Sequence, residues 1–169
     1  MTMVEVCVSM VVLLVAIGGT LSTISGHLVL GESARETALA YLEAQRLVER
    51  LKAEDFRTLF ARYNASAADD PAGTPSPGAN FDVAGLAPSP TDQDGRVGRI
   101  SFPVRDDEPA KLREDLEFNG RTLDLNADGN SDPDDHSNDF VVLPIRVRIA
   151  WRGRSGSRFI EIQTILASP

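Results

Sequence analysis

Oxygen-bearing side chains recur at regular spacing in an acidic stretch of the C-terminal half. Counted from Asp124 as position one, Asp or Asn stands at positions one, three, five, seven, nine and twelve: Asp124, Asn126, Asp128, Asn130, Asp132 and Asp135. Gly129 stands at position six, where a calcium-binding loop turns sharply. Because Ca²⁺ takes roughly six to eight oxygen ligands in flexible geometry, the spacing predicts a loop that binds Ca²⁺.

Electrostatics favours an ion in this loop. Residues 124–139 include six Asp and no Lys or Arg, and their carboxylates repel one another unless a cation lies between them. The loop resembles dockerin-type calcium loops, which also accept Asp at the last position. Ser131, however, replaces the usual apolar residue, and the flanks look like strands rather than EF-hand helices. A solvated loop of common turn-forming residues is the alternative. The adjacent His136 is interpreted as a surface residue, not a ligand.

A second charged residue stands out at the N-terminus. In residues 1–30 only Glu5, Cys7 and His27 are ionisable, and no Lys or Arg precedes Arg35. A helix needs about twenty mostly apolar residues to cross a bilayer, so this run is long enough. A carboxylate in such apolar surroundings is costly unless a cation meets it. Glu5 is therefore predicted to have a functional partner.

The string Thr2-Met3-Val4-Glu5-Val6, followed by an apolar helix, resembles the N-terminus of type IV pilins and pseudopilins. In that family a leader is removed just before the first mature residue, and the new amine is methylated. The Glu at the fifth mature position then pairs with that amine on a neighbouring subunit. The resemblance implies that Met1 bears the processed amine and that Thr2 and Glu5 belong to the assembly and processing motif.

Two departures from the family pattern affect this interpretation. The family usually opens with Phe where this chain has Met1, and often has Pro where Ser22 stands. Gly18-Gly19 could weaken the helix in its place. No basic leader precedes Met1, so we expect either a processed chain or a start at an internal Met. An ordinary signal anchor is the alternative, but it predicts a positively charged segment before the apolar run and leaves Glu5 without a role.

Two helical segments are predicted before the head. Residues 1–30 form a transmembrane or filament-core helix, and residues 31–63 continue it as an amphipathic helix. Apolar residues at three- and four-residue spacing give the amphipathic segment a single apolar stripe: Ala40, Tyr41, Ala44, Leu47, Val48 and Leu51.

Residues 64–169 are predicted to form a globular head. The Pro-rich residues 65–90 are expected to be a surface loop without regular structure, and 124–139 form the acidic loop. Residues 99–104 look like a short edge strand because of Pro103, and 116–125 like a second strand. Alternating apolar residues predict a C-terminal β-hairpin at 140–166. The fold class is thus α+β, a long N-terminal helix packed on a small antiparallel sheet.

Composition excludes several functions. The 169-residue chain carries a net charge of −8, so nucleic acid is not an expected partner. Cys7 is the only cysteine, and no intramolecular disulfide can form. The sequence has no nucleophile elbow, phosphate loop, HExxH or paired-Cys motif. We therefore do not expect an enzyme.

The resemblance implies a structural subunit, of the minor kind, of a type IV pilus or a type II secretion-like pseudopilus. Its expected partners are other pilin or pseudopilin subunits, the prepilin peptidase and methyltransferase, and the membrane before assembly. It would span the bacterial inner membrane once, with the head outside the cytoplasm, and then enter a periplasmic or surface filament. The alternative is a membrane-anchored calcium-binding recognition module that does not polymerise.

Overall fold

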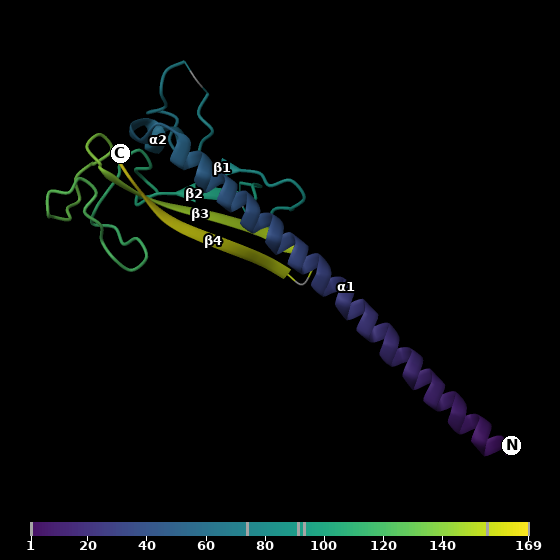
Figure 1. The fold of residues 1–169 in the computed structure, drawn as a ribbon. Coiled ribbons are helices and arrows are strands. Elements are labelled where there is room, and N and C mark those ends of the chain that lie inside the picture. Colours follow the sequence, from purple (N-terminus) through teal and green to yellow (C-terminus); the bar gives the residue numbers. More distant parts are fainter. Residues whose placement is uncertain (1, 74, 91, 93, 155, 169) are drawn as a thin grey trace. The chain divides into compact units, whose positions relative to one another are not determined.

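A computed structural model describes residues 2–73, 75–90, 92, 94–154 and 156–168, and for residues 24–26 and 28 it describes the backbone only. The described elements follow the order α1, α2, β1, β2, β3 and β4 (Figure 1). The chain divides into two compact units, Met1–Ala38 and Leu39–Pro169. Each unit is described by itself below.

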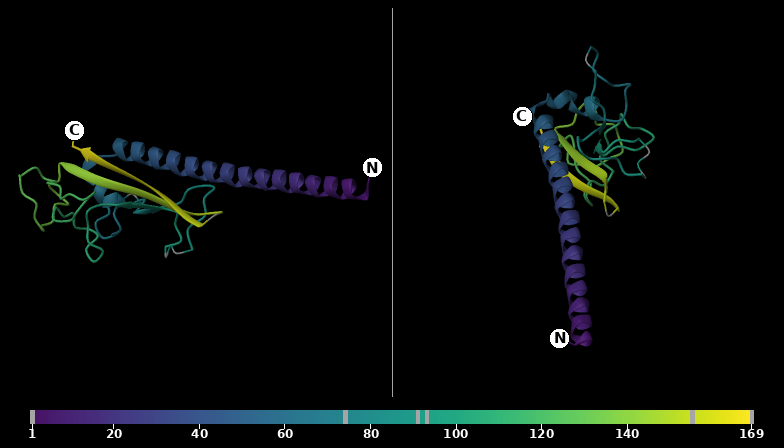
Figure 2. Two further views of the ribbon diagram at one scale, coloured as in Figure 1. Left: turned by 90° about the horizontal axis from the view of Figure 1, so that it is seen from below. Right: turned by 90° about the vertical axis from the view of Figure 1, so that its right-hand side faces the viewer.

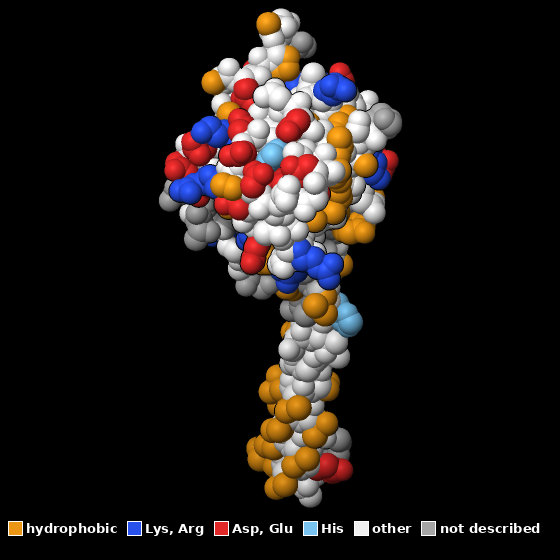
Figure 3. Space-filling view, turned by 90° about the vertical axis from the view of Figure 1, so that its left-hand side faces the viewer, with side chains coloured by type: hydrophobic (Ala, Val, Ile, Leu, Met, Phe, Trp, Pro, Cys, Tyr) orange, Lys and Arg blue, Asp and Glu red, His pale blue; other side chains and the backbone are white. Residues whose placement is uncertain are grey.

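The first unit consists of the N-terminal part of helix α1 (Met3–Ala53). Its segment Met3–Thr23 has a mean hydropathy of 2.3 and none of it is buried. Figure 3 shows the apolar side chains that cover this region of the chain. By length and composition this helix could span a membrane, as the sequence predicts. Gly18 and Gly19 are helical like their neighbours.

Helix α1 ends earlier than the predicted continuation to residue 63. It stops at Ala53, and a separate helix, α2, covers Phe56–Tyr63. The cause is Asp55, which is extended at φ −65° and ψ 116° and accepts a hydrogen bond from the Arg57 N–H at 3.1 Å. A carboxylate that caps a new helix also ends the preceding one, because its backbone leaves the helical region.

Four antiparallel strands form one sheet in the order β1 (Asn80–Phe81), β2 (Gly98–Ser101), β3 (Val142–Gly153) and β4 (Gly156–Ala167). The fold class α+β is thereby confirmed. Strands β3 and β4 pair along their whole length, from the Val142–Ala167 pair to the Gly153–Gly156 pair. They are the long yellow-green ribbons of Figure 2.

Two predictions about the shorter strands are wrong. Strand β2 lies inside the sheet, since Arg99 pairs with Asn80 on one side and with Arg148 on the other. Pro103 follows the strand, so the ladder does not need the N–H that proline lacks. The Pro-rich stretch 65–90 is not free of regular structure, because it contains β1.

The expected strand at 116–125 is also absent from the described residues. Phe118 and Arg121 form only an isolated bridge around Asn119 and Gly120. Both turn residues have positive φ, 56° for Asn119 and 74° for Gly120. This is the conformation that a tight Asn-Gly hairpin turn requires. A turn at Asn119 and Gly120 is therefore present without strands on either side of it.

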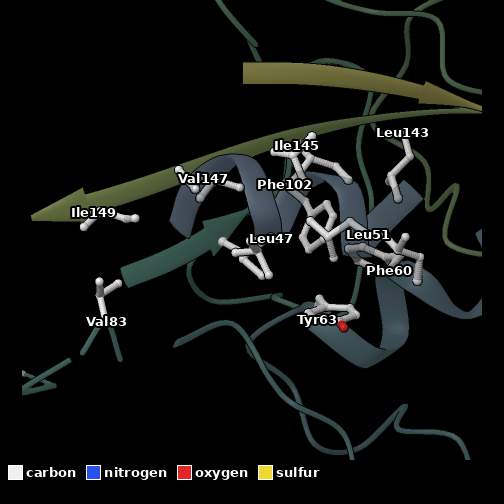
Figure 4. Packing of buried hydrophobic residues seen from close by; sticks show 14 of the residues in the cluster. Leu47, Leu51, Phe60, Tyr63, Val83, Phe102, Leu143, Ile145, Val147 and Ile149 are labelled. Carbon is white, nitrogen blue, oxygen red and sulfur yellow. The ribbon is translucent and has the colours of Figure 1, made fainter. Parts of the chain in front are cut away.

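The core of the second unit lies between the sheet and the two helices. Alternate side chains of β3 are buried in one cluster with the apolar stripe of α1 and with the buried face of α2. Figure 4 shows Leu47 and Leu51 of α1 with Leu143, Ile145 and Val147 of β3. The prediction that the sheet packs on this stripe is confirmed for all its members except Tyr41, which is 51% exposed and lies outside the core.

Candidate functional site

The N-terminal motif forms a reciprocal cap at the start of α1. The Glu5 N–H lies 3.4 Å from the Thr2 hydroxyl oxygen, and the Thr2 N–H lies 3.4 Å from Glu5 Oε2. This is a capping box, which the T-x-x-E spacing signals and which our sequence analysis missed. Met1, the predicted site of the processed amine, lies outside the described residues.

Both hydrogen bonds of this cap are long, since an N–H···O bond has its mode at about 2.9–3.0 Å. The side chain of Glu5 is exposed. Among the described residues, its carboxylate thus accepts only a long hydrogen bond from a neutral donor, the Thr2 N–H.

The first half of the acidic loop curls around the carboxylate of Asp124. Asp124 Oδ1 accepts hydrogen bonds from the N–H groups of Ala127 at 2.6 Å and Asp128 at 3.2 Å, and Oδ2 accepts from Gly129 at 2.8 Å. Ala127 and Gly129 have positive φ, 63° and 90°. The sharp turn predicted at Gly129 is present, and it brings Asp124 and Asp128 close together.

Glu114 reaches this loop from a preceding segment. Its Oε1 accepts hydrogen bonds from the Leu125 N–H at 2.6 Å and the Asn126 N–H at 3.1 Å. The side chain is fully buried, and Oε2 has no hydrogen-bond partner among the described residues. A buried carboxylate oxygen in this state is unusual and costly.

Sequence analysis missed Glu114 because its neighbours are charged: Lys111, Arg113 and Asp115. One signal was available. Glu114 stands two residues after Leu112 and two before Leu116, in register with the apolar side chains. Such alternation indicates a side chain that points inward.

His136 is buried, so the prediction of a surface residue is wrong. Its Nε2 lies 3.1 Å from Asp132 Oδ1 and 3.8 Å from Glu114 Oε2, and its Nδ1 lies 3.2 Å from Asp139 Oδ1. Burial by itself lowers the pKa of His136. The hydrogen bond that Asp132 accepts from His136 Nε2 and the charges of Glu114 and Asp139 together outweigh burial, so the pKa is raised.

The pKa of Asp132, the carboxylate that contacts His136 Nε2, is shifted as well. The pKa of Asp132 is lowered, mainly because the Asp134 N–H donates to it at 2.9 Å and also because of the hydrogen bond with His136. The charged forms of both groups are therefore favoured, and they make an imidazolium–carboxylate pair.

The described residues contain two groups of side chains whose ligand atoms all lie within 4.8 Å of one another. One group is Glu114, Asp124 and Asp128, and the other is Glu114, Asp132 and His136. Figure 3 draws a face of the head on which several acidic side chains lie around a histidine.

The predicted ligand set is therefore only partly assembled. The structure brings Asp124 and Asp128 together and places Asp132 with His136 instead. Asp135 belongs to neither group, is exposed, and accepts the Ser137 N–H at 3.0 Å.

The same holds for the two predicted Asn ligands. Asn130 is exposed and donates its N–H to Asp128 Oδ1 at 2.7 Å. Asn126 Oδ1 accepts the Asp128 N–H at 3.0 Å, and its amide nitrogen lies 3.4 Å from His136 Nδ1. Asn126 thus lies between the two groups.

The chemistry of the two groups differs. Three carboxylates offer only hard oxygen ligands, which suit Ca²⁺ or Mg²⁺. In the other group both nitrogens of His136 already lie beside carboxylates, so a metal ion there would have to displace one of these contacts.

Comparisons with protein-family models, with curated proteins and with solved structures return no match for this chain. Its class is defined by its own features, an apolar N-terminal helix followed by an antiparallel sheet in an α+β fold. This arrangement is compatible with a pilin-like fold.

Proposed function

We propose that the chain is a structural subunit, of the minor kind, of a type IV pilus or a type II secretion-like pseudopilus. The observation that carries the proposal is the segment Met3–Thr23, an apolar helix with no residue buried in its own chain. The proposal includes a prepilin peptidase and methyltransferase as processing partners and no catalytic activity of its own. It places the helix first in the inner membrane and then in a filament.

The physical argument starts from exposed apolar surface. Large apolar side chains of this segment are about half or more exposed, for example Leu14 at 69% and Val15 at 70%. Burying such surface is favourable by about 25 cal/mol per Å². A lipid bilayer and a bundle of like helices both provide that burial. A helix can therefore leave the membrane for a filament core without exposing its side chains to water.

Glu5 would give that bundle its register. It is the only Asp, Glu, Lys or Arg in residues 1–30. In an apolar bundle its carboxylate is stabilised only where a neighbour's N-terminal amine lies beside it. Because the hydrogen bond from the Thr2 N–H is long, exchanging it for a charged amine costs little and adds a charge-assisted hydrogen bond.

The experiment compares Glu5→Gln with Glu49→Gln, a matched change on the exposed region of α1 in the second unit. Each variant replaces the wild-type chain in its native cells, and filaments are sheared off and separated from membranes. We expect Glu5→Gln to remain in the membrane fraction with a folded head, and Glu49→Gln to enter filaments. Normal incorporation of Glu5→Gln would refute the role of Glu5 in register.

The second candidate is a membrane-anchored calcium-binding recognition module that does not polymerise. The group Glu114, Asp124 and Asp128 favours it, since a calcium site could shape a binding surface in either kind of protein. The two candidates differ at the N-terminus. The module requires neither leader removal nor Glu5, so the mass of the N-terminal peptide from native cells separates them. A single added methyl group on a processed amine supports the filament subunit.

A further inference from the structure

The geometry points to Glu114 as the residue that closes the calcium site of the acidic loop, in place of Asp135 at position twelve. The ligand core is then Glu114 with Asp124 and Asp128, joined from two separate segments of the head. This inference rests on the proposed calcium loop. It does not depend on whether the chain polymerises.

The first argument is the state of the Glu114 carboxylate. Its side chain has no exposed surface, and one oxygen is satisfied by two backbone N–H groups. The other oxygen, Oε2, has no hydrogen bond among the described residues and lies 3.8 Å from His136 Nε2. A buried anionic oxygen that accepts no hydrogen bond is unfavourable even with an imidazolium 3.8 Å away, because nothing replaces the water that it has lost. A bound cation would satisfy it.

The second argument is distance. Ca²⁺ binds oxygens at about 2.3–2.6 Å, so two oxygens on one ion are at most about 5 Å apart. The ligand atoms of Glu114, Asp124 and Asp128 lie within 4.8 Å of one another. One ion can therefore contact all three carboxylates. Three negative charges on a divalent cation suit Ca²⁺, whose affinity rises with the number of charged ligands.

The third argument concerns Asp135. An EF-hand loop places a bidentate Glu at position twelve, and Asp is shorter by one methylene group. Asp135 is exposed and turns back to accept the Ser137 N–H at 3.0 Å. Glu114 has the longer side chain, and the N–H groups of Leu125 and Asn126 fix its carboxylate beside the start of the loop. Glu114 thus supplies the carboxylate that position twelve does not.

The other group, with Asp132 and His136, is less suited to Ca²⁺. Both imidazole nitrogens of His136 lie within 3.2 Å of a carboxylate oxygen. Nε2 lies beside Asp132, and Nδ1 lies beside Asp139. In those contacts the positive charge of His136 already offsets the negative charges of Asp132 and Asp139. A transition metal would have to break one of them. The oxygen-only group has no such internal cation.

The test uses the full chain in a non-ionic detergent. Ca²⁺ is titrated by calorimetry into the wild type, Glu114→Gln and Asp135→Asn. Each change removes one charge and keeps the size of the side chain, and Gln retains an oxygen for the Leu125 and Asn126 N–H groups. We expect Glu114→Gln to weaken Ca²⁺ binding about tenfold or more, because affinity follows ligand charge. Asp135→Asn should bind like the wild type.

Thermal unfolding distinguishes a calcium ligand from a residue that only supports the fold, because only the loss of a ligand abolishes the effect of Ca²⁺ on the unfolding temperature. In EDTA, Glu114→Gln should unfold close to the wild-type temperature, because the amide oxygen still accepts the Leu125 and Asn126 N–H groups and only the 3.8 Å ion pair with His136 is lost. It should then lose the rise in unfolding temperature that Ca²⁺ gives the wild type. If Glu114→Gln does not fold, Glu114→Asp replaces it, and the same weakening of Ca²⁺ binding is expected from the withdrawn carboxylate.

The outcomes separate the inference from the proposal on which it rests. If the wild type binds Ca²⁺ and only Asp135→Asn weakens binding, the loop binds calcium but Glu114 does not close it. If the wild type binds no Ca²⁺, the calcium loop and the inference both fail. If Zn²⁺ binds more tightly than Ca²⁺ and is lost in His136→Gln, the site belongs to the other group, and the inference is overturned.

Discussion

Replacing Gly98 by Ala tests how the short strand β1 is held against β2. Gly98 pairs with Phe81 across the two strands. A Cβ added at Gly98 would lie 2.2 Å from Cε2 and Cζ of the Phe81 ring, whereas ordinary contacts begin at 3.4 Å. The ring or the strand must therefore move by roughly 1 Å, in a close-packed interior that yields little.

The expected loss follows from this geometry. Overpacking costs typically about 1–3 kcal/mol, and the gain from replacing Gly by Ala at a tolerant position is only about 0.4–1 kcal/mol. Phe81 is half-buried, so its ring has some room to turn towards solvent. We expect Gly98→Ala to lower the free energy of unfolding by about 1–2 kcal/mol.

The assay is urea unfolding of the full chain in detergent. Trp151 is the only tryptophan and is 1% exposed, so its fluorescence reports on the core of the head. With a slope of about 2 kcal/mol per molar urea, the middle of the usual range, the midpoint should fall by roughly 0.5–1 M. Gly31→Ala is the matched control, because an added Cβ there meets nothing within 4 Å.

A double-mutant cycle decides whether the ring is the cause. In a Phe81→Ala background the clash is gone, so Gly98→Ala should cost nothing or stabilise slightly. The coupling energy between the two positions should then be about 1–3 kcal/mol. If Gly98→Ala costs the same in both backgrounds, the contact with Phe81 is not its cause, and the reasoning fails.

Two further perturbations test the head. The raised pKa of His136 means that the folded state binds its proton more tightly. This contribution to stability is therefore complete below the ordinary value of 6.5 and is lost as pH rises through the folded pKa. In EDTA, the difference in stability between wild type and His136→Gln should shrink over that range, and a constant difference would contradict this. Asp55→Ala removes the N-cap of α2 and should cost about 1 kcal/mol in urea unfolding, whereas Asp94→Ala, at an exposed turn, should cost much less.

The elements of the fold that could be predicted are those with a local pattern. Alternation along β3 and β4 maps directly onto the two faces of a strand, and the stripe from Ala40 to Leu51 maps onto one face of a helix. The break at Asp55 had a local signal, an N-cap residue, but helical periodicity on both sides obscured it. Strand β1 had none, because two residues become a strand only through pairing with β2.

The candidate site, like the fold, has parts that local sequence patterns predict and parts that they do not. The spacing from Asp124 to Asp128 follows from short-range turn chemistry, and the structure has that turn. Burial of His136 and of Glu114 depends on two loops that meet in space. Backbone hydrogen bonds join these loops, from Asp115 N–H to Asp132 O at 3.1 Å and from His136 N–H to Leu112 O at 2.9 Å. No local rule links those positions along the chain.

Glu5 and Glu114 pose the same electrostatic problem in different surroundings. Each carboxylate accepts hydrogen bonds from backbone N–H groups. Glu5 accepts one from Thr2, and Glu114 accepts those of Leu125 and Asn126. Neutral donors stabilise an anion but leave its net charge uncompensated. In an apolar bundle or a buried loop, such a carboxylate is stabilised by a cation that lies beside it. The proposed amine of a neighbour and the proposed Ca²⁺ are those cations, so changing either Glu to Gln should remove the need for the cation together with its binding. Loss of assembly or of Ca²⁺ binding in a variant that remains folded is the result that both proposals require.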